Sequence, residues 1–382
     1  MKKINIKQFF VAKNANKLSS ASIFVIVLTI FLCALGCVMV YSASSYSALK
    51  NYGNSFFFLT KQIVGVFVGA LGLIFFYFFD YGKLKKLKWL LVAVAVIGLV
   101  LVFVPGIGAS NYGATRWIRI AGISLQPSEF AKFALVVFCA SYMSDNYQKI
   151  KSFVTLIPPL CVGGILCLLV ILEPNMSVTM CLGLTLITML IAGGISKKHF
   201  LTLAGPAIAL VPTLIIIEPY RMKRLMAFVN PWANPQGEGF QLIQSLYALG
   251  NGGLFGVGLF NSRQKYLFLP FSESDFIFAI IGEELGLIGA TLVIGAFVAL
   301  VVCIIKIGLN AKDRFGALLC TGIASLIAIQ VAINIAVVTG SIPPTGIPLP
   351  FISAGSTSLL VFMSAIGVVL NVDRQSRKSV IQ

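Results

Sequence analysis

Five basic residues stand out in the segment between residues 218 and 274 of a chain that carries few charges: Arg221, Lys223, Arg224, Arg263 and Lys265. Guanidinium and ammonium groups gathered in this way bind anions, and phosphate is an anion that suits arginine especially well. The simpler alternative is that these side chains only contact lipid headgroups. The sequence leaves both interpretations open.

Acidic residues are scarcer, with 12 Asp and Glu among 382 residues, so each one outside a basic loop needs a reason. Asp275 follows Ser274 at the start of a long apolar run, where either side chain could cap a helix. We expect Ser274 to be the cap, which leaves Asp275 as a candidate for chemistry. Glu283 and Glu284 come about two turns later, and structural ion pairing is the main alternative to a role of Glu283 in ligand binding.

Two further pairs of charged residues have a spacing or a setting that suggests where they lie. Glu129 and Lys132 are three residues apart after Pro127, so they can form a pair on one helix face or contact a ligand. Arg116 and Arg119 flank an aromatic residue, which is typical of a membrane interface, and Arg116 is kept as a candidate ligand contact.

The elements that must position these groups are membrane helices. Hydrophobic residues make up 58% of the chain, charged residues only 11%, and the mean hydropathy is +0.96. A water-soluble fold of this length cannot bury so much apolar surface, so a soluble enzyme, a secreted disulfide scaffold and a disordered chain are excluded. The sequence predicts an all-α integral membrane protein.

Ten apolar runs are long enough to serve as spans. Placing the N-terminus in the cytoplasm puts 19 of the 29 Lys and Arg in cytoplasmic segments, which satisfies the positive-inside rule with both termini inside. In a soluble protein a net charge of +17 would suggest nucleic-acid binding, but here the membrane topology accounts for it. The expected spans are 22–42, 56–79, 89–106, 127–144, 154–172, 175–194, 200–217, 275–305, 315–339 and 350–371.

The expected domain organisation is a basic cytoplasmic segment (1–21), one membrane domain (22–371) and a cytoplasmic tail (372–382). An extracellular loop (218–274) lies between the seventh and eighth spans, and such long loops are usually functional. Its apolar part, Phe240 to Phe260, is interrupted by five glycines, which suits re-entrant or interfacial helices better than a span. An outer location of the loop cations favours lipid phosphates or a lipid-linked pyrophosphate as the bound anion.

Cysteine and histidine chemistry is not expected. The eight cysteines all lie in apolar stretches and none forms a CxxC pair, while His199 is the single histidine. We therefore predict neither a structural disulfide nor a metal site made from thiols or imidazoles. The first apolar run has no cleavage site of the A-x-A type and is expected to remain as a span.

Seven ordered motifs resemble the SEDS family (shape, elongation, division and sporulation), most closely its FtsW branch, with RodA and SpoVE as relatives. The resemblance covers nearly the whole chain. The motifs are Gln126–Lys132 (QPSEFAK), Arg221–Arg224 (RMKR), Asn230–Trp232 (NPW), Gln264–Pro270 (QKYLFLP), Ser274–Ala279 (SDFIFA), Gly282–Gly286 (GEELG) and Pro348–Ser353 (PLPFIS).

The resemblance implies a peptidoglycan glycosyltransferase that polymerises lipid II on the outer face of the cytoplasmic membrane, at the septum during division. It implies that Asp275 is the essential loop aspartate, that Mg²⁺ or Mn²⁺ assists, and that a class B penicillin-binding protein and other divisome proteins are partners. Asp275 could take the acceptor proton while the loop cations neutralise the leaving pyrophosphate. Asp275 and Glu273 are the expected metal ligands. The alternatives are a lipid II flippase and a non-catalytic scaffold that recruits a transpeptidase.

Overall fold

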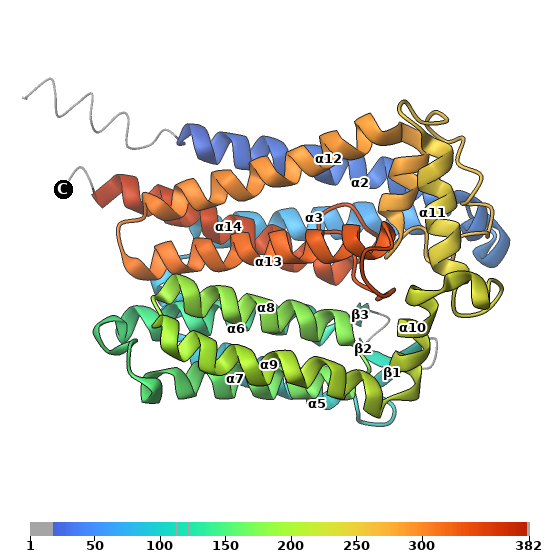
Figure 1. The fold of residues 1–382 in the computed structure, drawn as a ribbon. Coiled ribbons are helices and arrows are strands. Elements are labelled where there is room, and N and C mark those ends of the chain that lie inside the picture. Colours follow the sequence, from blue (N-terminus) through green and yellow to red (C-terminus); the bar gives the residue numbers. More distant parts are fainter. Residues whose placement is uncertain (1–17, 112–113, 121–122, 380–382) are drawn as a thin grey trace, which may run out of the picture.

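The computed structural model describes residues 18–111, 114–120 and 123–379, so most of the expected basic segment 1–21 lies outside the described residues. The described chain is mostly helical, and seven of its helices are long and apolar enough to cross a membrane (Figure 1). These are α2 (Ser20–Tyr52), α3 (Phe57–Phe78), α7 (Phe153–Leu172), α8 (Met176–Gly193), α12 (Ile277–Leu309), α13 (Arg314–Val338) and α14 (Ser356–Ser379).

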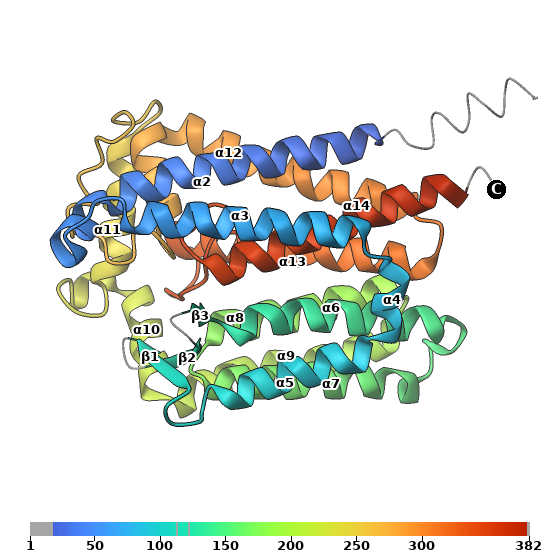
Figure 2. The same cartoon turned by 180° about the vertical axis from the view of Figure 1, so that it is seen from behind.

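Three further helices coincide with the remaining expected spans: α5 (Lys88–Leu101), α6 (Pro127–Asp145) and α9 (Lys197–Ile217). The short helix α4 (Tyr81–Lys86) turns the chain from α3 into α5 (Figure 2). Helix ends follow local chemistry. Ser19 accepts a hydrogen bond from the Ser22 amide at the start of α2, and Gly53 ends that helix with a left-handed backbone at φ 68°.

The bundle has two groups of helices, α2, α3 and α12–α14 on one side and α5–α9 on the other (Figures 1 and 2). Helix α13 packs against both α6 and α8 and so joins the groups. Residues 131–141 of α6 are all buried, whereas α2 and α3 expose large apolar side chains on their outer faces. The outward faces suit lipid, and the buried helices form the core.

The structure corrects the expectation of a purely helical fold. Three short strands form an antiparallel sheet in the order β1 (Gly108–Asn111), β2 (Ala114–Ile120) and β3 (Ile123–Leu125), with Ile118 opposite Leu125. The run Thr115–Ile120 is rich in β-branched and aromatic residues and is bounded in the sequence by glycines, which favours a strand. Arg116 is therefore carried by a strand.

The long connection between α9 and α12 contains α10 (Pro219–Val229), the 3₁₀ turn η2 (Pro231–Ala233) and α11 (Phe240–Gly252). These elements and the sheet lie at one end of the bundle, while the C-terminal end of α14 and the α12–α13 connection lie at the other (Figure 1). At that second end, α14 continues through most of the expected tail 372–382.

Helix α12 is broken at Gly286, whose backbone has φ 67° and ψ −170°. The loop after α11 inserts at the break, where the Val257 amide donates to Glu283 O and the Leu287 amide donates to Gly253 O. A β-carbon at Gly286 would lie 2.3 Å from the Gly256 nitrogen, so the close approach of the two backbones requires glycine. The first part of α12 is thereby bonded to the preceding loop.

The expected Ser274 cap is wrong. Helix α12 begins at Ile277, its N-cap is Phe276, and no side chain makes a capping hydrogen bond there. Instead the Ser274 carbonyl accepts a hydrogen bond of 2.6 Å from the Ser353 hydroxyl. Ser274 and Asp275 therefore lie in a turn before the helix, tied to the segment that precedes α14.

Candidate functional site

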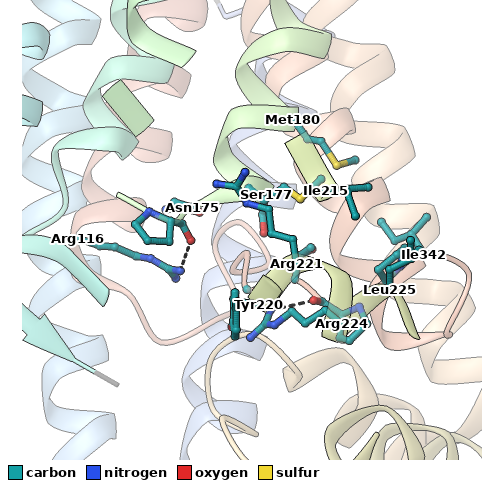
Figure 3. Close-up of a pocket in the computed structure, with 16 residues that line it drawn as sticks. Arg116, Asn175, Ser177, Met180, Ile215, Tyr220, Arg221, Arg224, Leu225 and Ile342 are labelled. Atoms are coloured by element: carbon teal, nitrogen blue, oxygen red, sulfur yellow. Dashed lines mark hydrogen bonds between the residues drawn. The ribbon is translucent and has the colours of Figure 1, made fainter. Parts of the chain in front are cut away.

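A cavity of about 230 Å³ opens where the sheet, α8, α9, α10 and the loop before α14 meet (Figure 3). Its walls are mainly apolar side chains, interrupted by three arginines. The lining residues are Arg116, Pro174, Asn175, Met176, Ser177, Met180, Ile215, Tyr220, Arg221, Arg224, Leu225 and Ile342–Gly346.

Backbone carbonyls orient the three guanidinium groups. Arg116 donates to the carbonyls of Glu173, at 3.3 Å, and Pro174. Arg221 donates to Ile171 O at 3.3 Å, and Arg224 donates to Pro344 O at 2.8 Å. Arg116 and Arg221 thus satisfy carbonyls at the C-terminal end of α7, which the helix itself leaves unpaired. These bonds hold the guanidinium groups at the cavity wall.

Two helix N-termini strengthen the positive character of this wall. Asn175 caps α8 by accepting from the Val178 amide, and Asn175, Met176 and Ser177 all line the cavity. The first turns of α10 supply Arg221 and Arg224. Since the N-terminal end of a helix carries partial positive charge, the arrangement favours an anion such as a phosphate.

Asp275 lies beside the cavity, next to Gly346 of its lining. Its Oδ2 atom is 2.5 Å from the point that a β-carbon on Gly346 would occupy, so the absence of a side chain there makes room for the carboxylate. Burial raises the pKa of Asp275 to about 6, with Glu273 adding to the rise while Arg116 and Arg224 oppose it. A carboxylate with this pKa is ionised at neutral pH and well placed to accept a proton.

A buried amide fixes the backbone on both sides of this contact. Asn334 of α13 is 1% exposed, and its Nδ2 donates at 2.8 Å both to Asp275 O and to Ile347 O. One side chain therefore holds the Asp275 turn and the Gly346 loop in register. The Ser353 hydroxyl and the Ala354 amide add bonds to Ser274 O and Glu273 O.

Glu129 and Lys132 lie away from the cavity lining. They form an i,i+3 pair at 2.7 Å, one of the two alternatives for these residues, with side chains 1% and 0% exposed. The Lys132 ammonium also donates to Gln330 Oε1, and Gln330 Nε2 donates to Pro348 O at 2.9 Å. The pair therefore supports the loop that carries Gly346.

Glu283 and Lys265 belong to a second network, between α2, α12 and the loop after α11. Lys265 pairs with Glu284 at 3.3 Å, and Ser42 donates to the same carboxylate at 2.6 Å. Glu283 accepts from the Arg263 amide at 3.1 Å and from the Ser262 hydroxyl. At this motif the structure shows the alternative of ion pairing, at Glu284.

Lys223 and Arg263 are exposed and do not line the cavity. The structure therefore brings together Asp275, Arg116, Arg221 and Arg224 from the predicted set. The other predicted contacts, Lys223, Arg263, Lys265, Glu129, Lys132 and Glu283, lie elsewhere.

Asp275 and Glu273 are close enough for Glu273 to raise the pKa of Asp275, and burial raises the pKa of Glu273 as well. Across the described ranges, no three His, Cys, Asp or Glu side chains gather in a group that could hold a metal ion. Two carboxylates nevertheless fit Mg²⁺ or Mn²⁺, because Mg²⁺ usually takes one or two carboxylates and completes its shell with water and substrate phosphates.

Sequence reasoning missed Glu173, Tyr220, Asn334 and Gly346. Tyr220 stacks under Arg224, whose guanidinium carbon lies 4.6 Å from the ring centre. The available signals were the Glu173-Pro-Asn turn and a polar Asn334 within an apolar span. A polar group inside a span is expensive, and here it has the specific task of holding two loops.

Known proteins resemble the chain over almost its whole length. The family model described as cell cycle protein, for FtsW, RodA and SpoVE, matches residues 22–378. Stage V sporulation protein E of Bacillus subtilis (strain 168) is 41% identical over 362 residues, which are 94% of this chain and 99% of that protein. A probable peptidoglycan glycosyltransferase FtsW of Trichlorobacter lovleyi is 40% identical over 357 residues, 93% of this chain and 94% of that one.

Solved structures share the fold. A chain from a peptidoglycan synthase complex, described as coordinating polymerization and crosslinking, aligns with a TM-score of 0.77 at 25% identity and covers 92% of this chain and 97% of that chain. The rod shape determining protein RodA of Thermus thermophilus aligns with a TM-score of 0.68 at 22% identity, over 92% of this chain and 96% of its own, and supports the fold alone.

Proposed function

Because the chain belongs to the family of FtsW, RodA and SpoVE, we propose that this multi-pass membrane protein is a peptidoglycan glycosyltransferase that polymerises lipid II. The observation that carries the proposal is the position of Asp275. Its carboxylate lies within electrostatic reach of Arg116 and Arg224, beside a cavity lined by three arginines.

The chemistry needs one base and one anion site. The donor sugar is α-linked to a pyrophosphate and the product is a β-1,4 glycan, so a single displacement inverts the configuration. The acceptor 4-hydroxyl oxygen forms the new bond to the anomeric carbon while its proton passes to Asp275. The bond from that carbon to the pyrophosphate breaks, and the electron pair leaves with the phosphate oxygen. Arg116, Arg221 and Arg224 neutralise the charge that develops there.

The proposed topology has ten spans with both termini in the cytoplasm. Basic residues of the loops gather at the end of the bundle that holds the α12–α13 connection, and the cavity lies at the opposite end. The positive-inside rule then places the cavity at the outer face. In this topology α10 and α11 are interfacial or re-entrant helices, and the hydrophobic tail of lipid II reaches the apolar wall formed by Met180, Ile215 and Leu225.

A divalent cation, Mg²⁺ or Mn²⁺, would be held by Asp275 and Glu273. When bound, it would supply further neutralisation of the pyrophosphate charge. The arginines of the cavity supply positive charge to the same pyrophosphate, so the cation is proposed as an aid and the proton transfer stays with Asp275.

A class B penicillin-binding protein is the proposed partner, together with other divisome proteins at the septum. The similar fold of a chain in a complex for polymerization and crosslinking supports a transpeptidase partner. Depletion in the source bacterium tests the division role, for which filamentous cells are expected. Normal division with defective spores would assign the chain to sporulation, as its similarity to stage V sporulation protein E allows.

The test of activity is polymerisation of labelled lipid II by the purified protein with its transpeptidase and Mn²⁺. Wild type should make long glycan, and Asp275→Asn should lose about 10²–10⁴-fold in rate. Asp145→Asn, the same substitution at the far end of α6, is the matched control and should retain activity. Equal rates for wild type and Asp275→Asn would show that Asp275 is not the base. No glycan from either protein, with lipid II movement across liposomes intact, would instead support a flippase, and recruitment alone would support a scaffold.

A further inference from the structure

Glu173 is a buried acid to which the proposed reaction assigns no role. It lies at the C-cap of α7, directly before Pro174 and Asn175 of the cavity wall, and is 0% exposed. Within the described chain neither carboxyl oxygen has a hydrogen-bond partner. A buried ionised carboxylate without partners is strongly unfavourable, so this group needs an explanation.

Arg116 is the neighbour that would be expected to pair with it. The Arg116 Nε donates to the main-chain oxygen of Glu173, and an Nη donates to that of Pro174. Neither bond goes to the carboxyl group, although an ionised carboxylate beside a guanidinium normally forms a direct, often bidentate pair. The geometry lacks the ion pair that a charged carboxyl would form with this guanidinium. Consistently, burial raises the pKa of Glu173 to about 8, and Arg116 only partly opposes the rise.

We propose that Glu173 is a positioning residue of the anion cavity: its carboxyl stays uncharged behind Arg116, so the guanidinium keeps its net charge and its remaining donors for a phosphate. The inference rests on the proposed function in taking that phosphate as part of the substrate. It adds a second carboxyl with the opposite requirement from Asp275, since Asp275 must be ionised and Glu173 must be neutral.

The charged groups around the Glu173 turn determine how ionisation of Glu173 would change anion binding. Arg116 acts on Glu173 from β2, and Arg221 reaches the same turn from α10 through Ile171 O. Tyr220, Arg224 and Asp275 also act on Arg116, from α10 and from the turn before α12. With Glu173 neutral, the arginines outnumber the acids at the cavity. Ionisation of Glu173 would offset the charge of Arg116, so anion affinity should fall as the pH rises through 8.

The experiment measures binding of inorganic pyrophosphate to the purified full-length protein in detergent, by calorimetry at pH 7 and pH 9. If the ionised form cannot bind, a carboxyl with a pKa of about 8 leaves roughly a tenth of the protein competent at pH 9. The Kd of wild type should then rise about tenfold more between the two pH values than that of Glu173→Gln, which cannot ionise. Comparing the proteins at each pH cancels the titration of pyrophosphate itself.

Glu173→Met, uncharged and of similar length, is the second variant and should show the same shallow pH dependence as Glu173→Gln. The matched control Glu238→Gln removes an exposed acid from the connection between η2 and α11 and should follow wild type. An equal change of Kd in wild type and both Glu173 variants would overturn the inference, as would the absence of pyrophosphate binding to wild type at both pH values. Lipid II polymerisation, assayed separately, keeps a failure of this inference distinct from a failure of the proposed function.

Discussion

Substituting Gly346 by alanine tests the placement of Asp275 with the smallest possible change. The added β-carbon would lie 2.5 Å from Asp275 Oδ2, whereas ordinary contacts begin at 3.4 Å, so the carboxylate must move by about 0.9 Å (3.4 − 2.5). Gly346 does not have a left-handed backbone, so alanine is compatible with its conformation. The substitution therefore displaces the base and leaves the fold in place.

The expected loss is large for activity and small for stability. A misplacement of about 1 Å at a reacting group costs roughly 10²-fold in rate, or about 2.7 kcal/mol of transition-state stabilisation. The atom that must yield is the end of a side chain. A conformationally compatible Gly→Ala change also stabilises by about 0.4–1 kcal/mol through the unfolded state, so the melting temperature should stay close to that of wild type.

The assay compares initial rates of lipid II polymerisation with thermal unfolding in the same detergent. Gly355→Ala is the matched control, because its β-carbon would lie an ordinary 3.7 Å from the nearest side-chain atom, Ser358 Cβ. It should keep both activity and stability. A Gly346→Ala protein with wild-type rate and wild-type melting temperature would refute the placement of the Asp275 carboxylate beside this loop.

Three further outcomes follow from the same geometry. Asp275 accepts a proton only when ionised, so with a pKa of about 6 the rate should fall about tenfold from its plateau by pH 5, and a flat profile from pH 5 to 7 would contradict its role. Asn334→Ala leaves one buried and one part-buried carbonyl without the amide donor and should destabilise the protein by roughly 2–4 kcal/mol, as measured by unfolding. Steady-state kinetics should show that it lowers kcat more than it raises KM. Lys132→Met leaves the Glu129 carboxylate buried and unpaired and should lower the unfolding free energy by about 3–5 kcal/mol. The double variant with Glu129→Gln should recover much of that loss. No recovery of stability would mean that the pair is not coupled.

Helix positions were predictable because a span depends on local properties, apolar length and flanking charge. The expected run 127–144 and the observed α6, Pro127–Asp145, differ by one residue, and the Glu129–Lys132 pair follows from helical spacing alone. The sheet was missed because the strand-forming signal in Thr115–Ile120 is short, and basic residues beside an aromatic also suit a membrane interface.

The cavity was only partly predictable because its contacts join segments far apart in the chain. Helical spacing would have distinguished the two cavity arginines of α10 from Lys223. Arg221 and Arg224 are three residues apart and share one face of the helix, whereas Lys223 does not line the cavity. No local pattern shows that Lys265 turns inward to Glu284 or that Arg116 reaches the α7–α8 turn. These facts depend on how distant helices pack.

The amide of Asn334 also determines when the enzyme becomes complete during its synthesis. The segments that carry Arg116, Arg221 and Arg224 are made before residue 230, whereas Ile342–Gly346, which completes the cavity and orients Arg224 through Pro344 O, is made later. Asp275 gains its clamp only after α13 and the loop with Ile347 have been translated and inserted. The base is therefore secured by nearly the last part of the chain to leave the ribosome. A nascent or truncated protein that stops before α13 carries the three arginines but has neither the completed cavity nor a secured base.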